Sequence, residues 1–186
     1  MRKVLLAVIL VLLVAAGRSN AVADQPVSQE YITANRMFAE GKYSYALSIY
    51  QGVFSSAAND VSPGEVQSRI GDCYFQLGDY KNALTSYRSA LLKQKTSQRP
   101  ATQYWIGFCS LLLGNAGDAV TEFLKVPAVY PLSGMWVNTS YYWAGRASEL
   151  MGKKDQAAAY YKKAGENGKT TQGRFAMKKA EAVKSK

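Results

Sequence analysis

The chain repeats a pattern of small and aromatic residues with a period of 36 to 38, and this repetition constrains its fold more than any other feature. An alanine recurs once per unit, at Ala46, Ala83, Ala119 and Ala157. An aromatic residue follows each alanine by four positions, at Tyr50, Tyr87, Phe123 and Tyr161. Two columns of small residues keep the same register, namely Ala34, Gly71, Gly107 and Gly145, and Gly41, Gly78, Gly114 and Gly152. Four such columns predict a helical solenoid, which offers binding surface rather than catalysis.

The residues in these columns have the sizes that pairs of packed helices require. Small residues such as Gly71 and Ala83 allow two helices of one pair to approach closely. The aromatic residue four positions after the alanine lies on the same helix face and fills the space between pairs. Gly78 suits a helix end with a positive φ, which glycine adopts without steric cost. Each unit is therefore expected to be a pair of helices.

At these positions the chain resembles tetratricopeptide repeats. The segment from Gln67 to Ala90 matches the small, aromatic and glycine positions of that repeat but lacks its early tryptophan. The third and fourth units depart further, with Ser110 and Ser148 where the second unit has Tyr74. The resemblance covers about residues 30–165. It implies an all-α, right-handed superhelical solenoid of about four helix pairs plus a C-terminal capping helix. An ordinary helical bundle with chance spacing is the alternative.

Helix-start and helix-stop signals place the elements. Ser62 and Pro63 combine a capping residue with a proline at the first helical position. Pro127 and Pro131 are expected to end the second helix of the third unit. The expected pairs span about 29–40 and 43–57, 64–77 and 80–94, 100–113 and 116–127, and 134–151 and 154–166, with a last helix near 171–184.

The N-terminal residues have the organisation of a secretory signal peptide. Arg2 and Lys3 precede an apolar run from Val4 to Ala16, and Ala21-Val22-Ala23 offers a small-x-small cleavage site. A retained signal anchor is the alternative, although the run is short for a membrane span. The sequence therefore predicts a signal peptide (1–23), a short disordered lead (24–28), a repeat domain (29–168) and a basic capping helix (169–186). Cleavage near Ala23 would leave a soluble protein, most simply in a bacterial periplasm.

The positive charge of the chain is concentrated at its C-terminal end. The chain has a net charge of +10, and residues 24–152 carry ten basic and ten acidic side chains. Residues 153–186 carry ten basic against three acidic side chains. This end is either a solvated cap of the solenoid or an electrostatic patch for anionic lipid, cell-wall polymer or an acidic partner. The basic residues assigned to it are Lys169, Arg174, Lys178, Lys179, Lys184 and Lys186. Phe175, Ala176, Ala180 and Val183 are expected to form its buried face.

Residues suited to catalysis are scarce. The chain has no histidine and only two cysteines, Cys73 and Cys109, which occupy one column of neighbouring units. Equivalent sites on stacked helices are usually too far apart for a disulfide, so two buried thiols are favoured over a bridge. Two cysteines without histidine make no zinc site, and the carboxylates are scattered singly. We predict a non-enzymatic protein without cofactor, metal, nucleic acid or small-molecule substrate.

The first helix of each pair is expected to line a concave groove for a protein segment, as is common in this repeat class. The period places a row of apolar and aromatic residues along that groove, with few charges at its centre. An exposed patch of this kind favours a partner site, although several of these side chains can instead belong to the framework. The assigned groove residues are Tyr31, Asn35, Phe38, Asp72, Phe75, Tyr104, Phe108, Leu111, Leu112, Tyr142 and Arg146.

The fourth unit suggests a cellular setting. The segments Tyr130–Ser133 and Tyr142–Ala147 resemble repeats of bacterial envelope proteins. Among these are the Tol–Pal-associated periplasmic cell-division coordinator and soluble lytic transglycosylases. The resemblance implies a periplasmic adaptor for protein partners in envelope assembly or maintenance. The alternative is a direct binder of cell-wall glycan or anionic lipid, through tyrosines and the basic C-terminal segment.

Overall fold

A computed structural model of the chain describes residues 28–56, 61–166 and 170–184. The predicted signal peptide (1–23) and all but the last residue of the predicted lead (24–28) lie outside these ranges. Within the described ranges, no helix is both long and apolar enough to cross a membrane.

The described residues form nine helices and no strand. The helices are α2 (Gln29–Ala39), α3 (Tyr43–Ser55), α4 (Pro63–Gln76), α5 (Tyr80–Lys93), α6 (Arg99–Leu112), α7 (Ala116–Val129), α8 (Gly134–Leu150), α9 (Lys154–Gly165) and α10 (Thr171–Lys184). Each boundary falls within two residues of the one expected from sequence, because the glycine and proline signals act locally.

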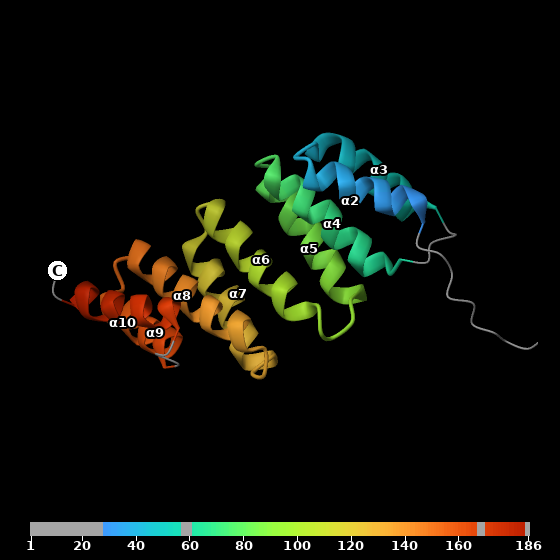
Figure 1. The fold of residues 1–186 in the computed structure, drawn as a ribbon. Coiled ribbons are helices and arrows are strands. Elements are labelled where there is room, and N and C mark those ends of the chain that lie inside the picture. The colour runs from blue at the N-terminus through green and yellow to red at the C-terminus, as the bar shows by residue number, and fades with distance from the viewer. Residues whose placement is uncertain (1–27, 57–60, 167–169, 185–186) are drawn as a thin grey trace, which may run out of the picture.

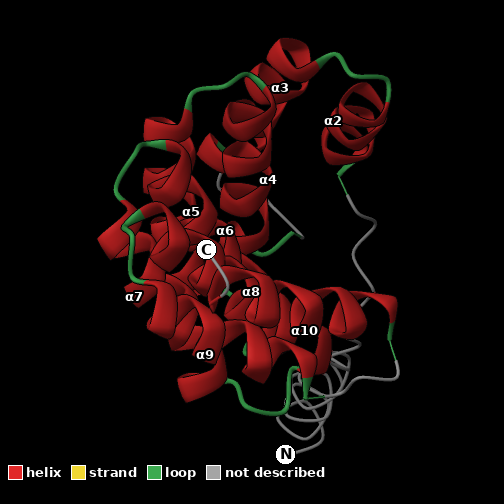
Figure 2. Cartoon of the chain, turned by 90° about the vertical axis from the view of Figure 1, so that its left-hand side faces the viewer, coloured by secondary structure: helices red, strands yellow, loops and turns green. Residues whose placement is uncertain are grey.

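Consecutive helices pack against one another along the chain, from α2 at one end to α10 at the other (Figure 1). Viewed along the stack, α2, α4, α6, α8 and α10 border an open space, and α3, α5, α7 and α9 lie outside them (Figure 2). The first helix of each pair therefore lines the inner side of a curved molecule. The inner helix α6 also packs on α8, whereas contacts between α4 and α6 are sparser.

The repeating columns meet inside each pair. A Cβ atom placed on Gly71 would lie 2.8 Å from ring carbons of Tyr87, a distance that real Cβ contacts do not show. Gly107 and Gly145 stand in the same relation to Phe123 and Tyr161, at 2.7 and 2.8 Å. In these three units the glycine is thus required by the aromatic ring packed inside its own pair, whereas the first unit has Ala34 at this position.

Where the aromatic residue of a unit is a tyrosine, its hydroxyl also forms a hydrogen bond. In three units the tyrosine hydroxyl donates to an acceptor on the first helix of its own pair: Tyr50 to Asn35 (2.6 Å), Tyr87 to Asp72 (2.8 Å) and Tyr161 to Glu149 (2.8 Å). In the third unit the aromatic residue is Phe123, and the position of Asn35 and Asp72 is taken by Phe108. A buried hydroxyl needs a partner, so tyrosine occurs where an acceptor is available.

Pro127 was expected to end its helix, but α7 continues past it to Val129. A proline removes one hydrogen-bond donor, which costs little near a helix end because few further bonds depend on it. The last turn is closed instead by the backbone N–H of Tyr130, which donates to the carbonyl of Val126 at 2.8 Å.

The last helix, α10, covers the apolar surface of α9. Ala176, Ala180 and Val183 are buried, and the last two join a cluster with Tyr161. Phe175 is not part of this face, contrary to expectation, and is 52% exposed. Neighbouring residues on a helix point about 100° apart, so the face defined by Ala176 excludes Phe175.

Candidate functional site

Aromatic side chains form a continuous strip along the inner helices α4, α6 and α8. We call the half-buried residues Phe75, Trp105, Phe108, Tyr142 and Trp143 the aromatic strip. The ring centroids of Phe75 lie 5.0 Å from Trp105 and 5.9 Å from Phe108, and those of Phe108 and Trp143 lie 4.6 Å apart. Tyr142 continues the strip 5.8 Å from Trp143. Edge-to-face packing of this kind holds the rings in fixed positions and leaves part of each on the surface.

Two tyrosines assigned to the groove belong to the core instead. Tyr31 and Tyr104 are 5% and 7% exposed. Their rings pack on the aromatic column of the outer helices, with centroids 5.7 Å from Tyr50 and 5.6 Å from Phe123. A ring that fills the space between two helices has no surface left for a partner. The framework alternative therefore holds for these two residues.

The polar and flanking residues assigned to the groove have partners within their own unit. Asn35 and Asp72 accept the tyrosine hydroxyls described above. Arg146 donates to Glu149 at 3.2 Å, and the ring of Phe38 packs 5.2 Å from that of Tyr43. These side chains support the helix pairs first, and they contribute to the inner surface only with their exposed parts.

Leu111 and Leu112 extend the strip at the C-terminal end of α6. Leu111 is half-buried in the cluster around Phe123, whereas Leu112 is 42% exposed. Leu112 follows Trp105 by seven residues and Phe108 by four, which places all three on one helix face. Leu112 is therefore the assigned groove residue with the most accessible apolar surface at this point of the strip.

Trp105 and Trp143 were missed as site residues, although the sequence contains a signal for them. They are separated by 38 residues, which is one repeat, and each follows an assigned tyrosine directly. Because neighbouring residues on a helix point in different directions, period alone did not show that this column also reaches the inner surface. The contacts of Trp105 with Phe75 and of Trp143 with Phe108 reveal it.

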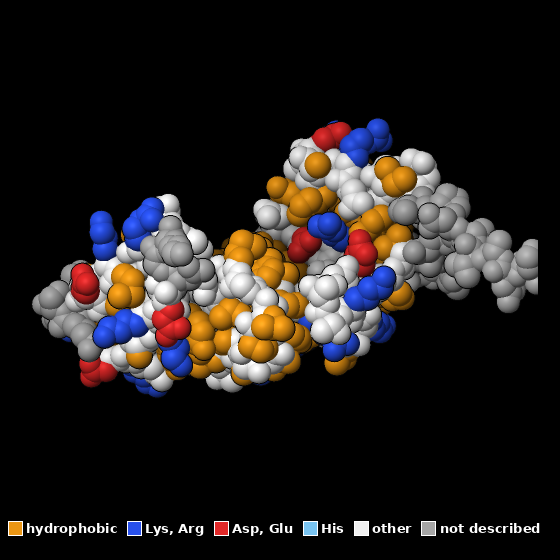
Figure 3. Space-filling view, turned by 60° about the horizontal axis from the view of Figure 1, so that its bottom comes forward, with side chains coloured by type: hydrophobic (Ala, Val, Ile, Leu, Met, Phe, Trp, Pro, Cys, Tyr) orange, Lys and Arg blue, Asp and Glu red, His pale blue; other side chains and the backbone are white. Residues whose placement is uncertain are grey.

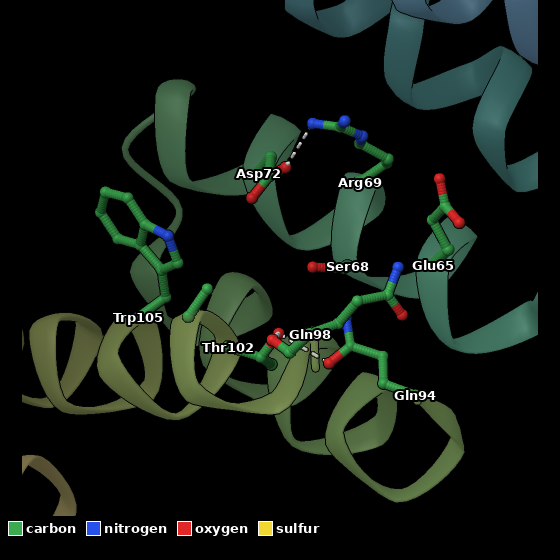
Figure 4. A pocket seen from close by; sticks show the side chains of 9 residues that line it. Glu65, Ser68, Arg69, Asp72, Gln94, Gln98, Thr102 and Trp105 are labelled. Carbon is green, nitrogen blue, oxygen red and sulfur yellow. Dashed lines mark hydrogen bonds and ion pairs between the residues drawn. The ribbon is translucent and has the colours of Figure 1, made fainter. Parts of the chain in front are cut away.

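A polar cleft opens between α4 and α6, next to the strip (Figure 4). Its volume is about 250 Å³. We define the polar cleft by its lining residues, Glu65, Ser68, Arg69, Asp72, Gln94, Gln98, Ala101, Thr102 and Trp105. The sparse contact between α4 and α6 leaves this space, and it lies where the connection from α5 enters α6. Of these residues, sequence analysis had assigned only Asp72.

The charged groups of the polar cleft are held by neighbouring helices. The Tyr31 hydroxyl of α2 donates to Glu65 at 2.7 Å, and Arg69 lies 3.3 Å from Asp72. Burial raises the pKa of Asp72, although the Tyr87 hydroxyl and Arg69 both oppose that rise. On the opposite wall, the Thr102 hydroxyl donates to Gln94 at 2.7 Å. The cleft is thus a fixed set of polar groups beside an indole ring.

A second apolar surface lies at the connections between helices. Figure 3 shows hydrophobic side chains gathered over the middle of the molecule, between regions richer in charge. A hollow of about 290 Å³ is lined by residues of the α5–α6 and α7–α8 connections and by Pro100 of α6 and Val129 of α7. Leu132, in the α7–α8 connection, is 98% exposed. Sequence analysis had assigned no binding residue to this segment, although Tyr130–Ser133 carried part of the resemblance to envelope proteins.

Some of the basic C-terminal side chains contact other residues of the fold. Lys179 lies 3.6 Å from Glu149 on α8, and Arg174 donates to the Thr171 hydroxyl at 3.2 Å. Lys178 is exposed. Lys169, Lys186 and the side chain of Lys184 lie outside the described part of the chain. The ion pair of Lys179 joins α10 to the preceding unit, which is the behaviour expected of a cap.

Both cysteines are buried and free. Burial raises the pKa of each thiol to about 12, so neither is a thiolate at neutral pH. The favoured reading of two buried thiols is therefore confirmed for Cys73 and Cys109. Within residues 28–56, 61–166 and 170–184, no cluster of three or more His, Cys, Asp or Glu side chains could hold a metal ion.

Comparison with known proteins identifies the architecture. The tetratricopeptide-repeat family model matches residues 64–92 and 139–164, within the second and fourth units. Solved structures that superpose on this chain include crystal structures of MamA, one of which has a TM-score of 0.60 at 17% identity. That match covers 82% of this chain and 94% of MamA. The fold is a tetratricopeptide-repeat solenoid. The predicted fold class, including the C-terminal capping helix, is thereby confirmed.

Two other tetratricopeptide-repeat structures are similar. A repeat protein from Parabacteroides merdae has a TM-score of 0.68 at 17% identity, covering 85% of this chain and 61% of that protein. The first repeat domain of Spaghetti (RPAP3), solved with an HSP90 peptide, has a TM-score of 0.55 at 16% identity, covering 66% of this chain and 94% of that domain. No curated protein matches this chain. Likenesses at these identities establish the fold alone, and the closer resemblance to the cell-division coordinator stays a prediction.

Proposed function

We propose that this chain is an exported, periplasmic scaffold that binds a segment of a partner protein on its inner surface, in assembly or maintenance of the cell envelope. The observation that carries the proposal is the aromatic strip, which presents fixed and partly exposed rings along three inner helices. Preorganised aromatic surface contributes strongly to binding because little entropy is lost when a partner covers it. The scaffold role fits a tetratricopeptide-repeat solenoid, and the RPAP3 domain, which is similar in fold, was solved with a bound HSP90 peptide.

The setting of this function rests on the sequence. The basic start, apolar run and small-x-small site of residues 1–23 support export, and the envelope-like segments of the fourth unit support a role there. A fusion of residues 1–23 to alkaline phosphatase, expressed in a bacterium, tests export. Active, processed enzyme in the periplasm is expected. Inactive enzyme retained in the cytoplasm would contradict the proposed localisation.

The binding surface is tested best at Leu112. Tyr104 is unsuitable because it is buried and its truncation would leave a cavity. Leu112→Glu places a charge on the strip at an exposed position, and Leu132→Glu, in the α7–α8 connection, is the matched control. Partners retained from a bacterial envelope extract by the wild-type protein and by Leu132→Glu should be lost with Leu112→Glu.

Other results would contradict the proposal. Retention of every partner by a folded Leu112→Glu variant would exclude the strip, and loss only with Leu132→Glu would place the partner at the connections. Co-sedimentation with purified sacculi or with anionic vesicles, equal for both variants and weakened by salt, would favour a direct wall or lipid binder.

A further inference from the structure

The polar cleft and the aromatic strip are one continuous surface. Trp105 belongs to both, because it packs on Phe75 and Phe108 and also lines the cleft. In Figure 4, Trp105 and Thr102 lie on the α6 side of the cleft, and Glu65 projects from α4 at the end of the cleft away from Trp105. A chain segment lying on the strip can therefore place one side chain into the cleft without leaving the inner surface.

The carboxylate of Glu65 is the least compensated charge in the cleft. Arg69 is engaged with Asp72 at 3.3 Å, and Asp72 also accepts the Tyr87 hydroxyl. Among the described residues, the Glu65 carboxylate forms a side-chain hydrogen bond only with the neutral Tyr31 hydroxyl and an ion pair with none, and it remains partly exposed. A carboxylate oriented in this way and left without a cation is a ready acceptor for one.

The remaining walls suit the body of a long basic side chain. Ala101 and the indole of Trp105 offer apolar surface from the strip inward, against which the methylene stem of a lysine or arginine can pack. Gln94, Gln98 and Ser68 add amide and hydroxyl oxygens around the cavity, which can accept hydrogen bonds from the charged group. A volume of about 250 Å³ accommodates one such side chain.

We propose that the polar cleft receives a lysine or arginine side chain of the segment bound on the aromatic strip, with its charged group paired to Glu65. The bound segment then carries an apolar residue for the strip next to a basic residue for the cleft. This specification rests on the proposed function, since it describes the partner of the same surface.

The net charge of the protein acts against this preference, which makes the preference informative. The chain has a net charge of +10, with none of the excess in residues 24–152, so its overall field favours acidic peptides. Selection of basic peptides therefore requires a local acceptor, and cannot arise from unspecific attraction. An acidic side chain in the cleft would face two carboxylates, Glu65 and Asp72, against the single guanidinium of Arg69, which already lies 3.3 Å from Asp72.

Selection from a random peptide library displayed on phage tests the proposal with the full-length protein. Wild type, Glu65→Gln, the control Glu181→Gln on the exposed side of α10, and Leu112→Glu are used as baits. Glu65→Gln keeps an oxygen acceptor for Tyr31, so the fold is expected to persist, and circular dichroism checks it. Wild type and Glu181→Gln should enrich peptides that combine an apolar residue with lysine or arginine.

Affinities of one selected peptide then decide the matter. Its Kd should weaken about tenfold or more with Glu65→Gln, or when its basic residue is replaced by glutamine. The two changes together should cost no more than either alone, because they remove one interaction. Peptides that need Leu112 but show no basic preference, or an equal Kd for wild type and Glu65→Gln, would overturn the cleft assignment alone. Absence of any peptide that depends on Leu112 would overturn the proposed function as well.

Discussion

Replacing Gly71 by alanine should test the close packing of the glycine against the aromatic ring of its pair. The new Cβ atom would lie 2.8 Å from two ring carbons of Tyr87, a residue that is fully buried. Overpacking of a core by one methyl group typically costs about 1–3 kcal/mol. The same change gains about 1 kcal/mol of helix propensity, so the net effect on the free energy of unfolding is smaller.

Gly52→Ala provides the matched control. Gly52 also lies inside a helix, α3, but a Cβ atom there would meet nothing within 4 Å. Both variants gain the same propensity, so the difference between them isolates the cost of packing against Tyr87. Gly52→Ala should be about 0.5–1 kcal/mol more stable than wild type. Gly71→Ala should be about 1–3 kcal/mol less stable than Gly52→Ala.

Urea unfolding followed by circular dichroism measures both free energies, and thermal melts give a second reading. A difference of 2 kcal/mol corresponds to roughly 4–8 °C in Tm for a chain of this size. In a Tyr87→Leu background the cost of Gly71→Ala should shrink, because the ring that it meets is gone. Equal stability of Gly71→Ala and Gly52→Ala would refute the reasoning. That result would mean that α4 and α5 can adjust to a Cβ atom at this position, where the first unit has the buried Ala34.

Three further outcomes follow from the structure. Cys73 and Cys109 should not react with a thiol reagent near neutral pH until urea unfolds the chain, because burial raises the pKa of both thiols to about 12. Rapid labelling of the thiols in the folded protein would contradict their burial. Burial raises the pKa of Asp72, so the folded state favours the protonated carboxyl. Wild type should therefore lose stability relative to Asp72→Asn as the pH rises from the ordinary range of an Asp carboxyl through that raised pKa. The urea midpoints of the two proteins are compared at about pH 4 and pH 7, and the same difference between them at both pH values would refute this. Deleting α10 should lower Tm and promote aggregation because the deletion uncovers α9. Lys179→Gln should change the free energy of unfolding by only about 0–1 kcal/mol. A deletion variant that melts like wild type would mean that α10 is no cap.

The candidate site was predictable in part. Phe75, Phe108 and Tyr142 were placed on the inner surface from the period alone, and the structure puts them in the aromatic strip. Tyr31 and Tyr104 occupy the same column as Tyr142, yet both are buried against the outer helices. The period gives the direction of a side chain from its helix. It does not give the position of the neighbouring helix, which decides whether the side chain ends in solvent or in the core.

The polar cleft shows most clearly what sequence alone does not contain. Nothing in the sequence assigned Glu65 or Arg69 to the groove, and Gln98 lies on a connection outside the repeat pattern. They line one cavity because α4 and α6 contact each other more sparsely than α6 and α8 do. How closely the helices of neighbouring units pack depends on the sum of many contacts rather than on any one column.

By itself, the sequence determined the number of helix pairs, their boundaries to within two residues and the positions where small and aromatic residues meet. Those features are local or repeat at a fixed distance, so glycine, proline and helical periodicity specify them directly. The tertiary structure alone decided which inner side chains remain exposed. It also decided that Glu65, beside the cleft, has among the described residues only the Tyr31 hydroxyl as a hydrogen-bond partner of its carboxylate. Exposure and charge compensation depend on distances between residues of different units, and only the packed solenoid fixes those distances.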